Sequence, residues 1–236
     1  MTHSPALVLA PGVYLAWQED MARVLDLERG RFFGLDGTAS EMVALGLHHD
    51  MPHVCARMAE RYDLDADTLR ADLEGLLADL HRQGLLAASR RPRRAGFLGW
   101  LTAPGRASGP ITPALVGRLL RRAWWSLRLT GWAPTLRRWS QPYATPSSPA
   151  PTDLPAQVDA AIREAASAQL LFPVACKERA LVAFHLLRAV HGLPAELIIG
   201  VQHYPFLAHA WVEFDGQTLT DDRAHCDNFE PVARFT

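Results

Sequence analysis

The sequence has few cysteines and no long apolar run. Three cysteines in 236 residues, Cys55, Cys176 and Cys226, cannot all pair, and their wide spacing does not fit a disulfide framework. No stretch of about 18 residues is both strongly apolar and free of charge, so a membrane-spanning helix is not expected. Residues 1–20 lack a basic start and are interrupted by proline and glycine, which argues against a signal peptide. These absences predict a protein of the reducing cytoplasm.

Acidic residues are absent from the middle of the chain. Residues 91–140 contain 10 arginines and no aspartate or glutamate, although the formal net charge of the whole chain is only −1. Residues 1–90 carry a net charge of −6, which is the wrong sign for neutralising nucleic-acid phosphates. A glycine-rich phosphate loop of the form GxxxxGK is also missing. The charge pattern predicts two acidic domains joined by a basic connector, with neither nucleic acid nor ATP bound by this chain.

The first 90 residues begin with a strand pattern. Runs of β-branched, aromatic and aliphatic residues predict short strands over residues 13–17, 22–27 and 31–35. The turn before the third strand contains Gly30, which can adopt a positive φ angle.

A helical pattern follows these strands. Thr38-x-x-Glu41 has the spacing of a capping box and predicts the start of a first helix. A second helix is expected over residues 52–61, and Asp65 or Asp67 can cap a third that ends at Gly84. The apolar stripe of this third helix consists of Leu69, Leu73, Leu76, Leu77 and Leu80. Three strands followed by three helices predict a winged-helix-like domain over residues 1–90.

The basic connector has two parts. Residues 91–110 are rich in arginine, glycine and proline, which predicts a linker. Residues 113–129 have a helical period, and tryptophans and arginines alternate through residue 139. We expect this helix to pack its apolar stripe on the second domain while its arginines meet acidic surface. The alternative is a helix that contacts a membrane surface or nucleic acid, with peripheral membrane contact through residues 113–139.

Residues 111–236 are expected to form the second domain, and residues 156–236 are its second patterned block. A long helix with a broad apolar face runs from Cys176 to His191, and Gly192 and Pro194 stop it. The other expected elements are a proline-rich extended loop over residues 142–155, a helix over 157–169, and strands over 195–202, 208–214 and 217–221. A hairpin signal, Asp215-Gly216, joins the last two strands.

Cys176 is the strongest candidate nucleophile. It lies in the first turn of the long helix, where backbone N–H groups and the helix dipole favour a thiolate over a thiol. The same N–H groups could stabilise an oxyanion. Considered alone, the residue is better explained as a small buried hydrophobic side chain, which is what most free cysteines are. A catalytic role therefore requires a base nearby and a group that orients this base.

His209 is the candidate base. It lies in the middle of a predicted strand between two alanines, which leaves room beside its ring. If Asp215-Gly216 is a two-residue turn, the hairpin register places Asp222 opposite His209, whereas a three-residue loop places Asp221 there. Either aspartate could fix the imidazole tautomer and stabilise an imidazolium, as in a catalytic triad.

Three segments of this block share a pattern with a known family. They are Cys176-x-x-Arg179-Ala180-Leu181, the run HGLPAELIIGV from His191 to Val201, and the run AHAWVE from Ala208 to Glu213 before Asp215-Gly216. Together they resemble the transglutaminase-like leader peptidase of lasso-peptide biosynthesis. The resemblance implies a papain-like cysteine peptidase fold over residues 111–236 and a Cys-His-Asp triad. Because the family's aspartate follows its histidine by twelve positions, the triad falls on Cys176, His209 and Asp221.

The N-terminal block carries a second resemblance. The run VLDLERGRFFGLD, Val24 to Asp36, is similar to small precursor-recognition domains of the PQQ-synthesis chaperone type. The two parts together resemble the fused form of the lasso-peptide B protein, an α+β protein of the cytoplasm. This resemblance implies that the chain binds the leader of a ribosomally made precursor peptide and hydrolyses the leader–core bond. It also implies a partner, an ATP-dependent, asparagine-synthetase-like cyclase. No cofactor or metal is expected.

The recognition role suggests where a leader would bind. Residues 31–35 would form an edge strand, to which an extended peptide can add by main-chain hydrogen bonds. The groove between this strand and the helix over residues 65–83 would supply side-chain pockets. The candidate leader-binding residues are Arg31, Phe32, Phe33, Leu35, Leu69 and Leu73.

Two other functions stay open at this point. The same triad could transfer an acyl group to an amine, as in a transglutaminase or a ligase. In a non-enzymatic delivery module, Cys176 would simply be part of the core. The cluster from His48 to Cys55 has metal-ligand residue types, but no second ligand cluster follows at zinc spacing, so no metal is expected there.

Overall fold

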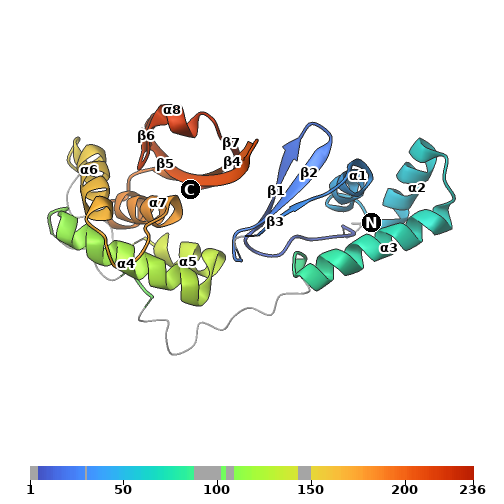
Figure 1. Ribbon diagram of the computed structural model, residues 1–236, viewed down its shortest axis with the longest axis horizontal. Helices are drawn as coiled ribbons and strands as arrows, with labels where there is room; N and C mark the ends of the chain where they lie inside the picture. The colour runs from blue at the N-terminus through green and yellow to red at the C-terminus, as the bar shows by residue number, and fades with distance from the viewer. Residues whose placement is uncertain (1–4, 30, 88–101, 105–108, 143–149) are drawn as a thin grey trace. The chain divides into compact units, whose positions relative to one another are not determined.

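A computed structural model describes residues 5–29, 31–87, 102–104, 109–142 and 150–236. The chain divides into two compact units, Met1–Arg93 and Arg94–Thr236 (Figure 1). Most of the expected linker over residues 91–110, and Gly30 in the expected turn, lie outside the described residues.

The first unit begins with an antiparallel sheet. Its strands are β1 (Val13–Gln18), β2 (Met21–Asp26) and β3 (Arg31–Gly34), in the order β1-β2-β3. The three expected strands are therefore confirmed. Because β2 is central, β3 is an edge strand, as the leader-binding hypothesis requires.

Three helices follow the sheet: α1 (Gly37–Gly46), α2 (Met51–Tyr62) and α3 (Ala66–Gln83). Asp65 caps α3 by accepting hydrogen bonds from the backbone N–H groups of Asp67 and Thr68, and Gly84 ends the helix in the left-handed conformation. One apolar cluster lies between the sheet and α3, and a second lies among the three helices. Both boundaries of the third helix agree with the sequence prediction.

The start of α1 differs from the expected capping box. The capping residue is Asp36, whose Oδ1 accepts a hydrogen bond of 2.8 Å from the backbone N–H of Ala39. Thr38 therefore lies inside the first turn, and the carboxylate of Glu41 binds Arg61 and Tyr62 instead. Aspartate is as good an N-cap as threonine, so the helix can begin earlier than the capping box indicated.

The second unit combines a sheet with a helical layer (Figure 1). Its strands β4 (Glu196–His203), β5 (Phe206–Phe214), β6 (Gln217–Leu219) and β7 (Glu230–Phe235) form an antiparallel sheet in the order β6-β5-β4-β7. The helices are α4 (Pro113–Thr130), α5 (Trp132–Trp139), α6 (Leu154–Ser167), α7 (Cys176–Phe184) and the short α8 (Arg223–Cys226).

Helix α7 is the centre of this unit. It packs on β5 and β4 and also contacts α4 and α6. The segment Ala180–Phe184 is fully buried, and a π-helical segment, His185–Val190, continues the helix to Gly192. The expected long helix from Cys176 to His191 is confirmed, with a change to wider turns over its second half. The buried helix holds Cys176 at a fixed place on the sheet.

The apolar face of helix α4 packs on the second domain as the favoured interpretation of the basic segment requires, whereas the expected contact of its arginines with acidic surface stays a prediction. Its apolar stripe is buried against α6 and α7, whereas Arg118, Arg121 and Arg128 are exposed. Within the expected linker, Thr102 and Pro104 are hydrogen-bonded to this helical layer: Trp139 donates to the carbonyl of Thr102, and Arg122 donates to that of Pro104. No helix in the described part of the chain is long and apolar enough to cross a membrane. Membrane contact through residues 113–139 stays a prediction.

The expected proline-rich loop is shorter than the sequence indicated. Pro155 belongs to the first turn of α6, which begins at Leu154. Proline is tolerated in a first helical turn because the N–H it lacks would have no partner within the helix. Residues 143–149 of the expected loop lie outside the described residues.

Gly200 provides a test of the packing of the sheet. A Cβ atom at this position would lie 2.7 Å from Cη2 of Trp211 and 2.9 Å from Cβ of Phe229. We expect Gly200→Ala to lower the free energy of unfolding by about 1–3 kcal/mol, because the added methyl group overpacks a filled site. Denaturant titration of the full chain measures this change.

Gly117 in α4 is the matched control in the same unit. Nothing lies within 4 Å of a Cβ added there. Gly117→Ala is expected to raise stability by up to about 1 kcal/mol, because alanine favours a helix more than glycine does. Equal effects of the two variants would contradict the packing described for Gly200.

Candidate active site

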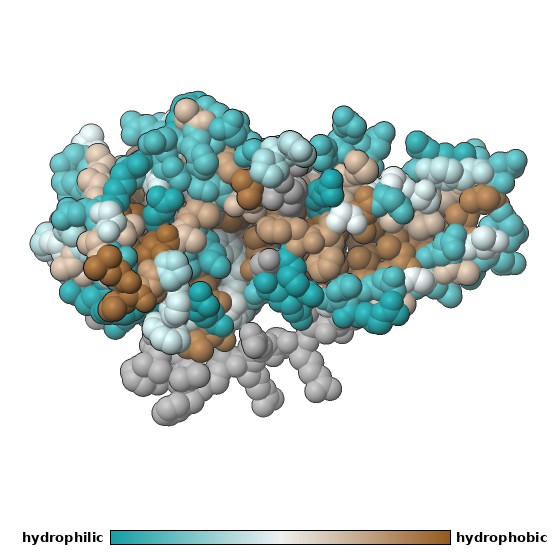
Figure 2. All heavy atoms as spheres, in the orientation of Figure 1, coloured by the Kyte–Doolittle hydropathy of each residue, from teal (hydrophilic) through white to brown (hydrophobic). Residues whose placement is uncertain are grey.

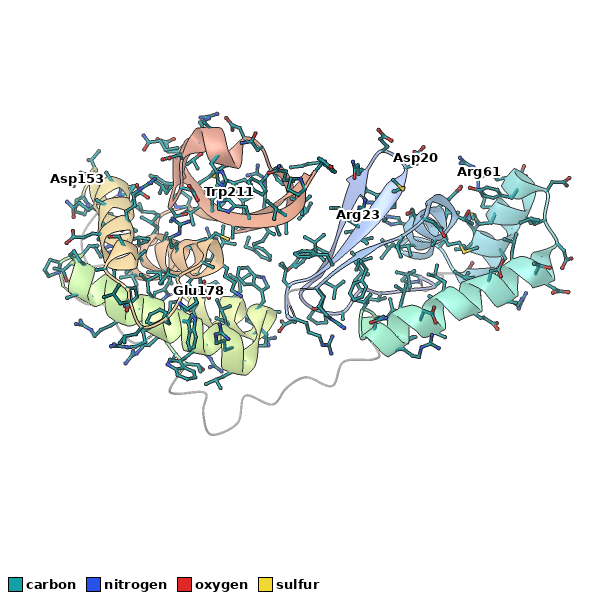
Figure 3. The ribbon with its side chains drawn as sticks, viewed as in Figure 1. Asp20, Arg23, Arg61, Asp153, Glu178 and Trp211 are labelled. Atoms are coloured by element: carbon teal, nitrogen blue, oxygen red, sulfur yellow. The ribbon has the colours of Figure 1, made fainter. Side chains whose placement is uncertain are left out.

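Cys176 is the first residue of α7. The residue before it, Ala175, is extended, and its backbone N–H donates a 2.9 Å hydrogen bond to Oε2 of Glu178. The side chain of Glu178 is almost fully buried near the start of the helix (Figure 3). This local hydrogen bond fixes the entry of the chain into α7 and with it the position of the thiol.

The environment of the thiol differs from the sequence prediction. Burial raises the pKa of Cys176 above its ordinary value, although the backbone N–H of Ala210 and the positive charge of Arg179 act in the opposite direction. The helix start does supply a donor that favours the thiolate, the backbone N–H of Lys177, but desolvation outweighs it, so the net shift of the pKa is opposite to the one expected from the sequence. Because the backbone N–H of Ala210 acts on the thiol, the sulfur lies next to β5, one residue beyond His209.

His209 lies in the middle of β5, and the residue is only 7% exposed. Its ring stacks on Trp211 at a centroid distance of 5.9 Å and lies 4.9 Å from the rings of both Phe229 and His225. Trp211 is on the same strand (Figure 3). The sequence predicts that the flanking alanines leave room beside the ring, but they do not. Side chains alternate between the two faces of a strand, so the alanines lie on the opposite face. Aromatic packing instead fixes the orientation of the imidazole.

Asp221 is the aspartate that reaches His209. Nε2 of His209 lies 3.1 Å from Oδ2 of Asp221, and Asp221 is 18% exposed. The ring N–H is not aligned well enough for a hydrogen bond, so the contact is a close electrostatic one. Burial lowers the pKa of His209, and the charge of Asp221 opposes this effect.

The carboxyl of Asp221 has a pKa below its ordinary value. Burial alone would raise this pKa, but the backbone N–H of Asp222, the guanidinium of Arg179 and His209 together lower it. Asp221 is therefore a carboxylate at neutral pH, as required of a group that orients an imidazole.

The hairpin register explains why the neighbouring aspartate is not the partner. Val212 pairs with Leu219 and Phe214 with Gln217, so Asp215-Gly216 is a two-residue turn. Continued pairing would have placed Asp222 opposite His209. However, β6 ends at Leu219, and Thr220 adopts a positive φ of 73°. The chain leaves the strand there and turns the side chain of Asp221 toward the histidine.

Two residues near this pair were not assigned a role from the sequence. Nη2 of Arg179 donates a 3.1 Å hydrogen bond to Oδ2 of Asp221. His225 of α8 packs edge-on against His209. The position of Arg179, three residues after Cys176 on one helix, is a signal that could have placed it on the same side as the thiol.

The same place contains a group of metal-ligand atoms. His209, Asp221 and His225 each offer one such atom within 4.8 Å of the others. Imidazole and carboxylate are ligand types that zinc accepts. However, Arg179 holds the carboxylate oxygen that also faces His209, and its positive charge would repel a cation. In the segment from His48 to Cys55, which has metal-ligand residue types, Asp50 caps α2 and Cys55 is buried in the core.

Four of the candidate leader-binding residues lie on or next to β3. Phe32 is 44% exposed on β3, and Arg31 bridges β3 to the end of α3 by donating to the carbonyl of Gln83. Phe33 and Leu35 are partly buried against the cluster between the sheet and α3. Figure 2 shows apolar side chains at the surface of this unit between its sheet and α3.

Leu69 and Leu73 are not part of the expected groove. Each is 1% exposed and lies in the cluster among the three helices. The part of α3 that packs with β3 is its later half, where Leu76, Leu77 and Leu80 contact the other cluster. The apolar stripe predicted for α3 is therefore buried or partly buried as expected, but it contributes to two apolar clusters. Only the second half of the stripe lies near the edge strand β3.

Comparisons with known proteins match both parts of the chain. The family model of the transglutaminase-like superfamily matches residues 115–234, and that of coenzyme PQQ synthesis protein D (PqqD) matches residues 22–86. The two family resemblances and the α+β class expected from the sequence are thereby confirmed: a PqqD-like N-terminal domain precedes a transglutaminase-like domain. No curated protein matches the chain significantly. The solved structure "TbiB1 in Complex with the TbiA(beta) Leader Peptide" is 25% identical, covering 35% of this chain and 98% of that one, with a TM-score of 0.33 that establishes no common fold.

The pH dependence of alkylation tests the state of the thiol. Because burial raises the pKa of Cys176, we expect its reaction with iodoacetamide to be slow at neutral pH and to accelerate only above the ordinary thiol range. Peptide mapping by mass spectrometry measures the rate at each cysteine. Cys55 and Cys226 serve as slow internal references because both are buried, and burial also raises the pKa of Cys226 to about 12. Fast labelling of Cys176 at pH 6 would show an activated thiolate and contradict this description.

Proposed function

The chain belongs to the transglutaminase-like superfamily, and from this premise we propose that it is a cysteine peptidase that removes the leader of a ribosomally made precursor peptide. The observation that carries the proposal is the contact of 3.1 Å between His209 and Asp221. His209 belongs to β5, the strand whose Ala210 N–H acts on the thiol of Cys176. A PqqD-like domain on the same chain supports a peptide as the substrate. The pathway we propose is the biosynthesis of a lasso peptide in the cytoplasm.

The proposed reaction begins from a neutral thiol and a neutral imidazole. Because Nε2 of His209 faces Asp221, Nδ1 is the ring nitrogen left to take the proton of Cys176 as the sulfur attacks the scissile carbonyl. The backbone N–H of Ala210 stabilises the developing charge on the sulfur. The imidazolium, stabilised by Asp221, then protonates the leaving amine. Water resolves the thioester, and His209 accepts a proton from this water.

The N-terminal unit would hold the leader. The edge of β3 offers main-chain groups to which an extended peptide can add as a fourth strand. The half-exposed ring of Phe32 offers an apolar contact outside the core. Phe33 and Leu35 shape this edge from the core side and Arg31 ties it to the end of α3, whereas Leu69 and Leu73 support it only through the helical core.

A second acceptor and a partner belong to the same proposal. The triad forms the same thioester whether water or an amine resolves it, so acyl transfer by a transglutaminase or ligase is the alternative reaction. In the peptidase pathway, the released core peptide passes to an ATP-dependent, asparagine-synthetase-like cyclase. The exposed arginines of α4 are a candidate contact for such a partner or for a membrane surface.

Incubation of the protein with a leader-bearing precursor peptide tests the proposal. We expect two fragments whose masses sum to the precursor plus one water, and none with Cys176→Ala. Asp221→Asn is expected to lower the rate by roughly 10²- to 10⁴-fold, since losing the aspartate of a serine protease triad costs on the order of 10⁴. Asp222→Asn should act like the wild type, because Asp222 is mostly exposed and contacts Arg163 rather than His209.

Mass spectrometry over time distinguishes the alternatives. A product that retains the mass of an added amine shows acyl transfer instead of hydrolysis. An intact precursor, with the cyclase present and the leader bound, shows a delivery module without catalysis. Cys226→Ala controls for general effects of removing a thiol from this unit, because that thiol is buried away from bulk solvent.

Leader binding gives an independent test of the first unit. Phe32→Ala is expected to weaken binding of a synthetic leader peptide at least about tenfold, because an exposed aromatic side chain at an interface is a common energetic centre. Leu64→Ala is the matched control, since Leu64 is 49% exposed but lies between α2 and α3. Fluorescence anisotropy with a labelled leader measures both affinities. Equal affinities would remove Phe32 from the leader site.

A further inference from the structure

We propose that Arg179 is a positioning residue for the Cys-His-Asp reaction, holding the carboxylate of Asp221 in place from the same helix that carries Cys176. This role rests on the proposed function, but it adds a residue to it. One helix would then set the position of both the nucleophile and the group that orients the base.

The contacts of Asp221 support this role. Oδ2 accepts a 3.1 Å hydrogen bond from Nη2 of Arg179 and lies at the same distance from Nε2 of His209. Oδ1 accepts a 2.9 Å hydrogen bond from the backbone N–H of Asp222. Arg179 is thus the side-chain donor that holds the oxygen facing the imidazole.

The backbone gives Asp221 little support of its own. The ladder between β5 and β6 ends at Leu219, and Thr220 turns away with a positive φ. The N–H of Thr220 donates to Oδ1 of Asp159 in α6, which anchors the turn. Since Asp221 lies beyond the strand, its position relative to His209 depends on side-chain contacts rather than on strand pairing.

The charges around the pair determine the expected pH effect. Asp221 is faced by His209 from β5, Arg179 from α7 and His225 from α8, while neighbouring Asp222 is paired with Arg163 of α6. The charge of Arg179 disfavours protonation of His209. Removing it leaves the negative charge of Asp221 with less compensation, so the pKa of His209 rises. Because neutral His209 is the base, the acid limb of the kcat/KM profile moves to higher pH.

Three variants of the full chain test this role with the leader-bearing precursor as substrate. For Arg179→Gln we expect kcat to fall roughly 10- to 100-fold with little change in KM, because a misplacement of about 1 Å costs up to 10²-fold in rate. The acid limb should move to higher pH. Arg179→Lys should restore the position of this limb, since it keeps the charge, but only part of kcat.

Arg163→Gln is the matched control. Arg163 is an arginine of the same unit that forms ion pairs with the adjacent Asp222 and with Asp159, whereas its charge acts on Asp221 only at longer range. This variant should keep the wild-type kcat and pH profile. If Arg179→Gln also keeps both, or if Arg163→Gln changes them equally, Arg179 is not a positioning residue.

A second measurement separates this role from the proposed function. NMR titration of the His209 ring, assigned with His209→Gln, follows the imidazole without any substrate. We expect its midpoint to rise in Arg179→Gln and not in Arg163→Gln. If the wild type cleaves nothing but the midpoint shifts, the peptidase proposal fails and the contact of Arg179 with the pair stands. If the wild type cleaves and the midpoint stays constant, the role of Arg179 is overturned.

Discussion

The geometry of the candidate site depends on how short β6 is. In the described chain this strand pairs only with Val212–Phe214 of β5, which leaves the neighbouring edge of β5 to the start of α7. There the N–H of Ala210 meets the sulfur of Cys176. A longer β6 would place its own backbone against this edge and keep the thiol away. The same early end of pairing releases Asp221 to turn toward His209.

Desolvation determines the resting charge of the three groups. Burial raises the pKa of the thiol and lowers that of the imidazole, so both are driven toward their neutral forms. The carboxyl behaves in the opposite way, because two donors, Arg179 and the N–H of Asp222, outweigh its burial. The site thus pairs a neutral nucleophile and base with a permanent charge, an arrangement suited to moving a proton during the reaction rather than before it.

Local patterns in the sequence predicted the elements well and the long-range contacts less well. Strands β1 to β6, the cap at Asp65 and the helix beginning at Cys176 follow from periodicity, capping residues and the Asp215-Gly216 turn, whereas β7 (Glu230–Phe235) was not expected from the sequence. The choice between Asp221 and Asp222 could not follow from register, because it depends on where pairing stops. The thiol's raised pKa could not be inferred either, since burial is a property of the packed helix. Likewise, the stripe of α3 revealed which leucines are apolar but not that they divide between two clusters.

The neutral state of Cys176 has a consequence for the life of the protein between turnovers. Hydrogen peroxide and other cellular electrophiles attack thiolates far faster than thiols. A sulfur that becomes anionic only as it attacks a bound carbonyl spends little time in the vulnerable form. We therefore expect the desolvation that raises the pKa of this partly exposed thiol also to slow its oxidation to sulfenic acid between turnovers.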